Sequence, residues 1–238
     1  MRRRLVCLAV LTLWPVALPG QSENMLAAPE KAQGWQLLFD GTTLKGWHSQ
    51  APAPSRGPAG AQQPVQQPAP GQVGSPKACV GARGDAAALV KPGGSHWEVV
   101  DGRLTACGEP TGYLTSDRSY TNFVLSIEFM CDVEANSGVF VRSPEENGGY
   151  EVQIWRQQPA GYNTGAIVGT AKTAREYTFK ADQWNHYQIT ADGDHMVVVL
   201  NGETTLDVRD AKFSNGHVRL QYQQFPMAFR NIKIRPLP

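Results

Sequence analysis

The feature that most constrains the fold is a long succession of short segments with the alternating pattern of β-strands. In residues 123–129 every second side chain is apolar, from Phe123 through Leu125 and Ile127 to Phe129. Successive strand side chains point to opposite faces, so each such segment has one face suited to a core. Comparable strands are predicted at residues 35–39, 97–100, 103–107, 138–142, 150–155, 165–169, 184–190, 196–200, 204–208, 217–222 and 229–234.

Turn signals separate these segments at short intervals. Asp101-Gly102 and Asn201-Gly202 are dipeptides of the kind that two-residue β-hairpins prefer. The chain has 24 glycines and 17 prolines among its 238 residues, and no long helical period interrupts the strands. Regularly spaced short strands predict an all-β protein, and we expect an antiparallel two-sheet jelly-roll sandwich.

The first residues have the pattern of an export signal. A basic start, Arg2-Arg3-Arg4, precedes an apolar stretch at residues 5–18, and we expect cleavage near Gly20. The apolar stretch is too short to favour a membrane anchor. The sequence therefore predicts a signal peptide at residues 1–20 and a periplasmic or secreted protein, with no membrane insertion after cleavage. Residues 21–34 are expected to form a flexible N-terminus.

Residues 50–95 differ in composition from the rest of the chain. They contain eight prolines and six glutamines, and such a segment cannot bury much apolar surface. We expect a long loop inserted into a single jelly-roll domain that spans residues 35–238. A proline-rich recognition segment is the alternative interpretation.

Charge and cysteine content limit the expected partners and cofactors. The formal net charge is +1 and no long basic run occurs, so nucleic acid is not an expected partner. No Cys-x-x-Cys pair, histidine cluster or Asp-rich loop argues for zinc or calcium, so we expect no cofactor. Cys79, Cys107 and Cys131 remain after signal removal, which allows at most one internal disulfide. Cys79–Cys107 and Cys107–Cys131 are both open as pairings.

Several strands carry large hydrogen-bonding side chains on the face opposite their apolar residues. In residues 150–154, for example, Glu151 and Gln153 alternate with the apolar side chains. Amides and guanidinium groups can bond sugar hydroxyls in pairs, and an indole can pack on a pyranose ring. We therefore predict a cleft for an oligosaccharide or glycoside; a polar face in contact with water is the alternative. The candidate residues are Glu128, Asn136, Arg142, Glu151, Gln153, Trp155 and Gln221.

The carboxylates of this set limit the chemistry. Ordinary glycoside hydrolysis needs two carboxyl groups that flank the scissile bond. Residues 150–155 supply only Glu151 at their alternate positions, so a second carboxylate would come from Glu128. Gln153 cannot act as an acid or base, but it can hold a substrate hydroxyl. This composition counts against the two-carboxylate mechanism.

The order of short motifs along the chain resembles a known family, the 3-keto-disaccharide hydrolase domain. The resemblance covers nearly all of residues 35–237 outside the insertion. Each motif alone is weak, but their succession is specific. The motifs are Leu38-Phe39-Asp40-Gly41, Gly46-Trp47, Trp97 to Gly102, Asn136-Ser137-Gly138-Val139, Tyr150 to Ile154, Thr164-Gly165-Ala166-Ile167, Trp184-Asn185, Leu200-Asn201-Gly202 and Phe229-Arg230-Asn231-Ile232.

The resemblance implies a concanavalin-like (laminin-G-like) jelly roll that is exported by bacteria. It also implies action on glycosides whose sugar carbon three is a ketone. Such a ketone acidifies the proton on carbon two, so one base can remove that proton and expel the aglycone, with water adding afterwards. This chemistry needs one base and an oxyanion stabiliser. It fits a single-carboxylate strand better than ordinary hydrolysis does.

Each candidate residue has an expected role under this hypothesis. Glu151 would be the base or acid, and Glu128 the second carboxylate or a ligand of a sugar hydroxyl. Trp155 would form a stacking wall, and Asn136 would reach the cleft from its loop. The sugar and its oxyanion would be held by Arg142, Gln153 and Gln221.

Two positions depart from the pattern of the family. Members commonly have an aspartate where this chain has Arg156, and a histidine after the Leu-Gln that corresponds to Leu220-Gln221, where this chain has Tyr222 and Gln223. If either missing group is catalytic in the family, this chain would bind a sugar without turning it over. The alternatives to an enzyme are therefore a lectin-like binding module and a structural cell-envelope domain.

Overall fold

The computed structural model describes residues 23–50, 97–106, 111–144, 148–156, 158, 160–223 and 227–238. The predicted signal peptide, most of the predicted insertion, Cys79 and Cys107 lie outside these residues. The elements are α1 (Ala28–Ala32), β1 (Gln36–Leu37), β2 (Trp47–Gln50), β3 (Trp97–Val100), β4 (Arg103–Ala106), β5 (Gly112–Tyr120), β6 (Phe123–Cys131), β7 (Ser137–Ser143), β8 (Tyr150–Ile154), β9 (Asn185–Asp192), β10 (His195–Leu200), β11 (Glu203–Arg209), β12 (Gly216–Tyr222) and β13 (Met227–Pro236).

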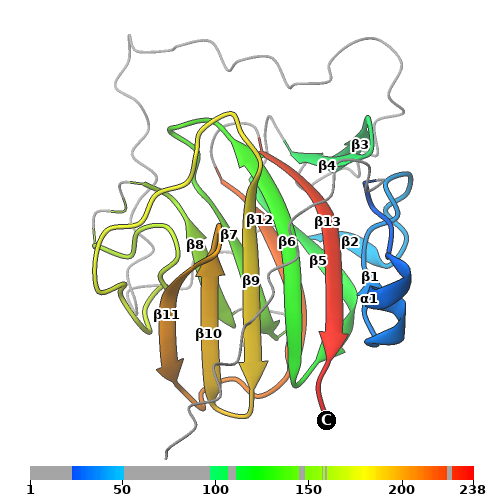
Figure 1. Cartoon of the computed structure of the whole chain (residues 1–238). Coiled ribbons are helices and arrows are strands. Elements are labelled where there is room, and N and C mark those ends of the chain that lie inside the picture. The colour runs from blue at the N-terminus through cyan, green and yellow to red at the C-terminus, as the bar shows by residue number, and fades with distance from the viewer. Residues whose placement is uncertain are drawn as a thin grey trace, which may run out of the picture.

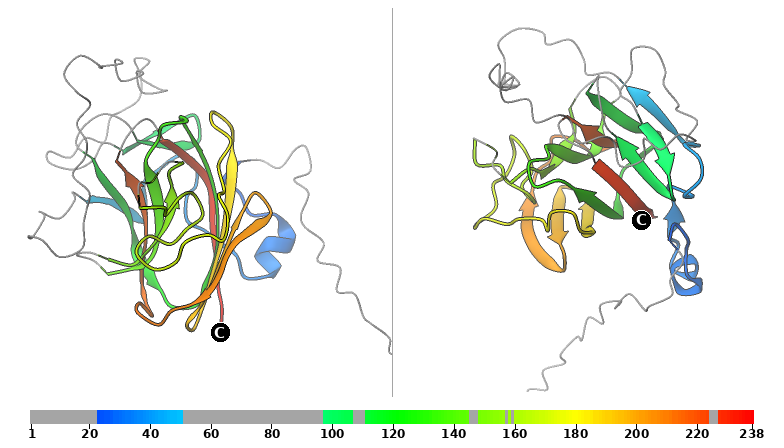
Figure 2. Two further views of the ribbon diagram at one scale, coloured as in Figure 1. Left: turned by 90° about the vertical axis from the view of Figure 1, so that its left-hand side faces the viewer. Right: turned by 90° about the horizontal axis from the view of Figure 1, so that it is seen from above.

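The strands form two antiparallel sheets that pack face to face. The eight-stranded sheet has the order β11-β10-β9-β6-β13-β4-β3, and β1 pairs with β13 beside this path. The five-stranded sheet has the order β2-β5-β12-β7-β8 and lies behind the first in Figure 1. The side and top views in Figure 2 show the two layers. The predicted antiparallel two-sheet jelly roll is confirmed.

The core lies between the sheets and follows the alternation seen in the sequence. Phe123, Leu125, Ile127 and Phe129 of β6 are fully buried and meet side chains of the five-stranded sheet such as Val152. Burying one side chain of this size contributes roughly 1.5–3 kcal/mol. In each strand, one set of alternate side chains fills this core. The other set therefore points to one of the two outer faces of the sandwich.

The strand predictions need correction in two respects: one predicted strand is absent, and two observed strands were not predicted. Residues 165–169 form turns in which Ile167 makes two isolated β-bridges, to Val152 and to Ala171, because Gly165 and Gly169 adopt left-handed φ angles of +85° and +70°. Conversely, β5 and β2 had no counterpart among the predicted strands. The outward positions of β5 are polar and several of its central residues are polar too, so its alternation is weak.

The N-terminal segment differs from the flexible stretch expected over residues 21–34. Asn24 is only 5% exposed, and α1 follows it. The backbone N–H of Asn24 donates to Asn231 Oδ1 at 2.7 Å, and Asn231 N–H donates back to Asn24 Oδ1 at 2.9 Å. Asn24 Nδ2 also donates to the carbonyl of Gly102 at 2.7 Å. The segment is ordered because it completes hydrogen bonds at a bulge of β13 and at the β3–β4 turn.

Cys131 is a free thiol in the core, and burial raises its pKa to about 12. The cysteines proposed to pair with each other or with Cys131 are Cys79 and Cys107, and both lie outside the described residues, so the pairing stays a prediction. In the described part of the chain, no helix has the length and apolarity that crossing a bilayer requires.

Candidate functional site

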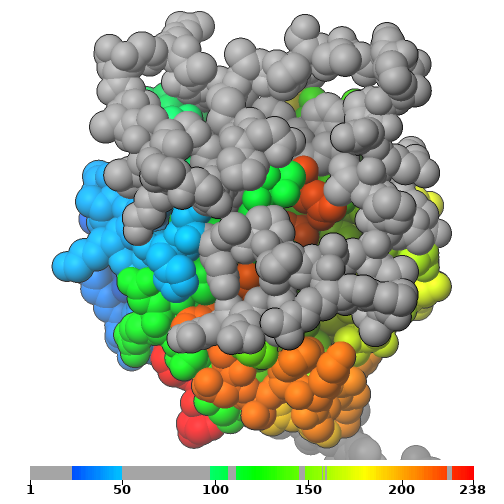
Figure 3. All heavy atoms as spheres, turned by 180° about the vertical axis from the view of Figure 1, so that it is seen from behind, coloured from blue at the N-terminus to red at the C-terminus, as the bar shows by residue number. Residues whose placement is uncertain are grey.

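The outer face of the five-stranded sheet carries the candidate site. Cross-strand register pairs Arg219 of β12 with Phe140 of β7, and Phe140 with Glu151 of β8. In the neighbouring row, Tyr113 of β5 pairs with Gln221, and Gly138 pairs with Gln153. These positions share one parity, opposite to the core residues of the same strands. Figure 3 views the molecule from this side of the sandwich. The Glu151 cluster consists of Tyr113, Gly138, Phe140, Glu151, Gln153, Arg219 and Gln221.

Glu151 has the chemically most reactive environment of this cluster. The residue is half-buried, and the protein around its carboxyl group displaces enough water for burial to raise its pKa to about 7. Among the described residues the structure records no hydrogen-bond or ion-pair partner for this carboxyl. It lies over Gly138, where an added Cβ would come within 3.0 Å of Glu151 Cγ and Oε1. A carboxyl with this pKa can take up and release a proton near neutral pH.

Gln153 is buried beside Glu151 and is held by its own strand. Its Oε1 accepts from the backbone N–H of Ile154 at 3.0 Å, and its carbonyl accepts from the Tyr187 hydroxyl at 2.7 Å and from the N–H of Gly165 at 3.0 Å. With Oε1 engaged in this way, the amide N–H₂ is the part of the side chain suited to donate to a ligand.

Gln221 and Tyr113 extend the cluster toward the middle of the sheet. Burial is the main cause that raises the pKa of Tyr113, the charge of Glu151 acts in the same direction, and the neighbouring Gln221 side chain acts against it. Gln221 is 8% exposed, yet its Oε1 is buried without a hydrogen-bond partner among the described residues. Leaving such a group unsatisfied costs about 1–3 kcal/mol. A donor from a bound ligand would remove this cost.

Arg219 supplies the buried cation of the cluster, a role for which the sequence analysis named Arg142. It is 2% exposed, its guanidinium lies 4.1 Å from the centre of the Tyr113 ring, and Nη1 donates to Ser143 Oγ at 3.1 Å. In the part of the chain that the structure describes, its Nε is buried without a hydrogen-bond partner, and burial lowers the pKa of the guanidinium group. No carboxylate of the described residues pairs with Arg219. Arg219 lies two residues before Gln221 in the predicted strand 217–222, so strand alternation places both on the same face and could have indicated it.

Arg142, predicted to bind substrate, is not part of the cluster. It has a left-handed φ of +50°, and its guanidinium donates to Thr121 O at 2.7 Å, to Gly193 O at 2.6 Å and to Asn122 Oδ1 at 3.1 Å. A register shift in β12 opposite this end of β7 breaks the simple parity on which the prediction depended. Arg142 joins three chain turns and its role is structural.

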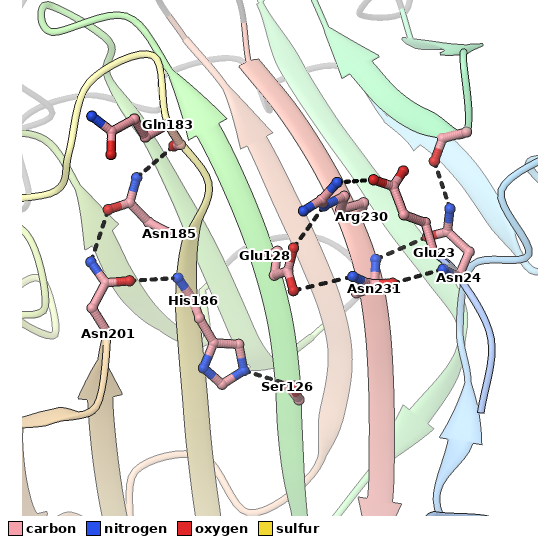
Figure 4. Close-up of polar contacts among 11 residues, drawn as sticks. Glu23, Asn24, Ser126, Glu128, Gln183, Asn185, His186, Asn201, Arg230 and Asn231 are labelled. Carbon is pink, nitrogen blue, oxygen red and sulfur yellow. Dashed lines mark hydrogen bonds and ion pairs between the residues drawn. The ribbon is translucent and has the colours of Figure 1, made fainter. Parts of the chain in front are cut away.

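Glu128 is also wrongly placed by the sequence prediction. It lies on β6, so its side chain is on the outer face of the eight-stranded sheet, across the core from Glu151. Its carboxylate accepts from Arg230 Nε at 2.7 Å and from Asn231 Nδ2 at 3.1 Å, and Arg230 also pairs with Glu23, as Figure 4 shows. Glu128 and Glu151 therefore cannot flank one glycosidic bond.

The remaining predicted residues lie at the end of β7 and β8. Asn136 is buried directly before β7 and shares the parity of Gly138, and Trp155 is half-buried directly after β8. By continuation of the register these two residues are neighbours at the edge of the cluster. Arg156 turns the other way, because its Nη2 donates to Phe179 O at 2.8 Å and its guanidinium lies 5.1 Å from the Phe179 ring.

Neither a metal-binding group of side chains nor the hollow recorded near β1 and β2 contributes to the Glu151 cluster. Among the described residues no group of three or more His, Cys, Asp or Glu side chains could hold a metal ion. A hollow of about 140 Å³ near β1 and β2 is lined by residues such as Leu38, Trp47 and Tyr120, and by none of the Glu151 cluster.

Solved structures share this fold. A provisionally assigned glycosyl hydrolase from Parabacteroides distasonis ATCC 8503 is 18% identical with a TM-score of 0.66, over 91% of this chain and 100% of that chain. Another such structure from the same organism is 22% identical with a TM-score of 0.56, over 86% and 84% of the two chains. A third is 26% identical with a TM-score of 0.53, over 59% and 90%.

Sequence comparison identifies the family. No curated protein matches the chain. The model of one protein family, described as the 3-keto-alpha-glucoside-1,2-lyase-like domain, matches residues 34–235 and so spans both sheets and the Glu151 cluster. The chain therefore belongs to the 3-keto-alpha-glucoside-1,2-lyase-like domain family.

Proposed function

We propose that this protein is an exported enzyme that cleaves 3-keto-glycosides, with Glu151 as the proton acceptor. The single observation that supports this most strongly is the Glu151 carboxyl, which has no partner among the described residues and a pKa of about 7. Polar groups that a structure leaves buried and unpaired favour a ligand that pairs with them. Family membership supports a carbohydrate ligand.

The proposed reaction begins at carbon two of the sugar. Glu151 takes the proton from this carbon, and the electron pair of the broken C–H bond moves into an enolate with the ketone at carbon three. Collapse of the enolate forms a double bond between carbons one and two and breaks the bond to the aglycone oxygen. The aglycone oxygen takes up the proton that Glu151 removed, which restores the carboxylate, and water then adds across the double bond of the unsaturated sugar. One base is sufficient for this sequence.

The other cluster residues have complementary roles in this proposal. Arg219 takes over the oxyanion role first assigned to Arg142, since its buried Nε can donate to the enolate oxygen. Gln221 Oε1 accepts from a sugar hydroxyl, and the Gln153 amide donates to another. Trp155 and Asn136 border the sugar at the strand ends. Glu128 has no part in the reaction.

Glu151→Gln and its matched control Glu128→Gln test the assignment. Both changes remove one outward-facing, half-buried carboxylate, but from opposite sides of the sandwich. With a 3-keto-glucoside as substrate, we expect Glu151→Gln to lower kcat by about 10²–10⁴-fold. The activity per folded molecule of Glu128→Gln should stay close to that of the parent. Equal rates for Glu151→Gln and the parent would refute the role of Glu151.

A carbohydrate-binding module without catalysis is the second candidate. Arg156, in place of the aspartate common in the family, is the observation that favours it, because the arginine side chain turns toward Phe179 and leaves no acid at that position. Calorimetry with a 3-keto-glucoside, alongside a product assay, separates the two functions. Heat of binding without product would support the module, whereas product would support the enzyme.

Export to the periplasm or the medium is part of the proposal and depends on residues 1–20. A basic start followed by a short apolar stretch supports it. N-terminal sequencing of the protein from its native cells should give a chain that starts near Gln21. A chain that still starts at Met1 in the cytoplasmic fraction would contradict export.

A further inference from the structure

Three residues of the Glu151 cluster form one row across the sheet. Arg219 is the register partner of Phe140, and Phe140 is the register partner of Glu151. Neighbouring strands are about 4.8 Å apart, so the backbones of Arg219 and Glu151 are separated by roughly 10 Å. Arginine and glutamate side chains together are long enough to meet across one intervening strand. The row therefore places a buried cation and a carboxyl within reach of each other.

These two groups do not form an ion pair. The guanidinium of Arg219 is turned toward the Tyr113 ring and Ser143 Oγ, and the carboxyl of Glu151 lies over Gly138. A buried charge normally has an opposite charge as its partner, because removing a lone ion from water costs several kcal/mol. The separation of the two groups therefore needs a physical cause.

Phe140 occupies the position between them. It is 8% exposed although it lies on the outer face of the sheet, where the other cluster residues except Gly138 are polar. Its ring meets the edge of Tyr113 at a centroid distance of 5.4 Å and an interplanar angle of 87°, and lies 5.9 Å from the Arg219 guanidinium. The aromatic ring thus packs beside Tyr113 and the arginine, at the register position between Arg219 and Glu151.

We propose that Phe140 is a positioning residue that prevents Glu151 and Arg219 from pairing with each other. The spacer keeps the carboxyl able to accept a proton and the guanidinium able to bind an oxyanion. Neither would be possible in a closed ion pair. The inference deepens the proposed function and depends on it for its catalytic meaning. The separation of the two charges can be measured without any substrate.

Few of the described residues around Glu151 carry a charge that could change the pKa of its carboxyl. The neighbouring strands present Gly138 and Phe140 from β7, Gln153 from β8, Arg219 and Gln221 from β12, and Tyr113 from β5. Among these described neighbours only Arg219 and Tyr113 are charged or titratable. The charge of Glu151 acts on Tyr113, and this coupling raises the tyrosine pKa. Arg219 is therefore the group whose approach would lower the pKa of Glu151.

The test is a titration of the Glu151 carboxyl by carbon-13 NMR of the glutamate-labelled full chain, with Glu151→Gln used to assign the signal. The parent should titrate at about 7. Phe140→Ala opens the path for the ion pair and should lower this midpoint by at least about one pH unit. Phe140→Leu keeps an apolar side chain in the path and should stay within a few tenths of a unit of the parent.

Two further variants decide the cause. In the double variant Phe140→Ala with Arg219→Gln no cation can approach, so the midpoint should return to about 7. An unchanged midpoint in Phe140→Ala would overturn the proposal, and so would an equally low midpoint in the double variant, because water entry would then be the cause. If Phe140→Ala does not fold, Arg219→Gln alone decides: a raised midpoint would show that the pair already exists and would overturn the proposal. These readings hold whether or not the protein turns over a glycoside.

Discussion

The two outward-facing carboxylates Glu128 and Glu151 lie on opposite sides of the same sandwich, and they differ in whether they are paired. Both are half-buried. Glu128 accepts from Arg230 and Asn231, and Arg230 is further held by Glu23 and by the Trp184 ring 3.9 Å away. Glu151 has no recorded partner among the described residues, and its pKa is raised to about 7.

This difference separates a structural network from a candidate site. On the side of Glu128, the ion pairs and hydrogen bonds of Glu128 and Arg230 join β6, β13 and the N-terminal segment, so the charges contribute to stability. On the side of Glu151, the carboxyl and the Arg219 and Gln221 atoms without partners cost stability in the free protein. Groups of this kind are expected where a ligand completes the interactions.

The largest effect on stability should follow from removal of the cation in the Glu128 network. Arg230→Ala leaves Glu128 and Glu23 without their shared partner, and we expect a loss of roughly 2–3 kcal/mol in the free energy of unfolding. The activity of the folded molecules should not change. Urea denaturation measures the first quantity. Arg209→Ala is the control, because its pair with Asp194 is exposed and should contribute about 0.5 kcal/mol or less.

If Arg230→Ala lost more activity than its loss of folded protein explains, the contrast between the Glu128 network and the Glu151 cluster would not hold. The Glu128 network would then serve the reaction as well as the fold.

An effect of comparable size and opposite sign is expected at Glu151. Its pKa is raised from 4.5 to about 7 on folding, so the unfolded chain releases this proton first as the pH rises. The carboxyl therefore contributes no penalty below pH 4.5, and its contribution to stability falls as the pH rises from 4.5 through 7, by roughly 2–3 kcal/mol in total. Glu151→Gln should remove this loss.

Denaturation of the parent and of Glu151→Gln at pH 4.5 and pH 8 measures the prediction. The variant should equal the parent at pH 4.5 and be more stable by about 2 kcal/mol at pH 8. Glu128→Gln should instead be less stable than the parent at pH 8, because it loses an ion pair. A Glu151→Gln variant that is destabilised at pH 8 would indicate that Glu151 has a structural partner after all.

The smallest change in stability is expected at Gly138. This variant tests the placement of the Glu151 carboxyl more closely. Gly138→Ala introduces a Cβ within 3.0 Å of Glu151 Oε1, and the flexible carboxylate can move away from it. We expect a loss of stability of about 1 kcal/mol or less and a fall in kcat/KM of roughly tenfold, since catalysis depends on exact placement of the base. Val139→Ala on the core face of the same strand is the control: it should lose more stability and little activity. The reverse order would contradict the placement of Glu151.

The sequence predicted the sandwich and part of the site, for physical reasons that the residues make clear. Strands whose apolar and polar residues alternate regularly have a definite inward face. Alternation therefore correctly placed Glu151 and Gln153 on the face opposite to that of Val152, and Gln221 on the face opposite to that of Leu220. Parity does not say to which sheet a strand belongs. A two-sheet sandwich has two outer faces, so Glu128 could share the parity of Glu151 and still lie on the other side.

Other errors arose where the backbone leaves the regular strand conformation. Arg142 has a left-handed φ and lies opposite a register shift, so alternate positions no longer share a face there. Residues 165–169 failed as a strand because of two left-handed glycines. The order of the N-terminal segment depends on Asn24 meeting Asn231, 207 residues away, and no local pattern announces such a contact.

The most direct measurement is a crystal structure of Glu151→Gln with a bound 3-keto-glucoside, since this variant should bind the sugar without consuming it. The sugar is expected on the outer face of the five-stranded sheet, with carbon two facing residue 151, the ketone oxygen near Arg219 Nε and a hydroxyl on Gln221 Oε1. A sugar bound on the other sheet beside Glu128 and Arg230 would contradict the assignment of the two faces.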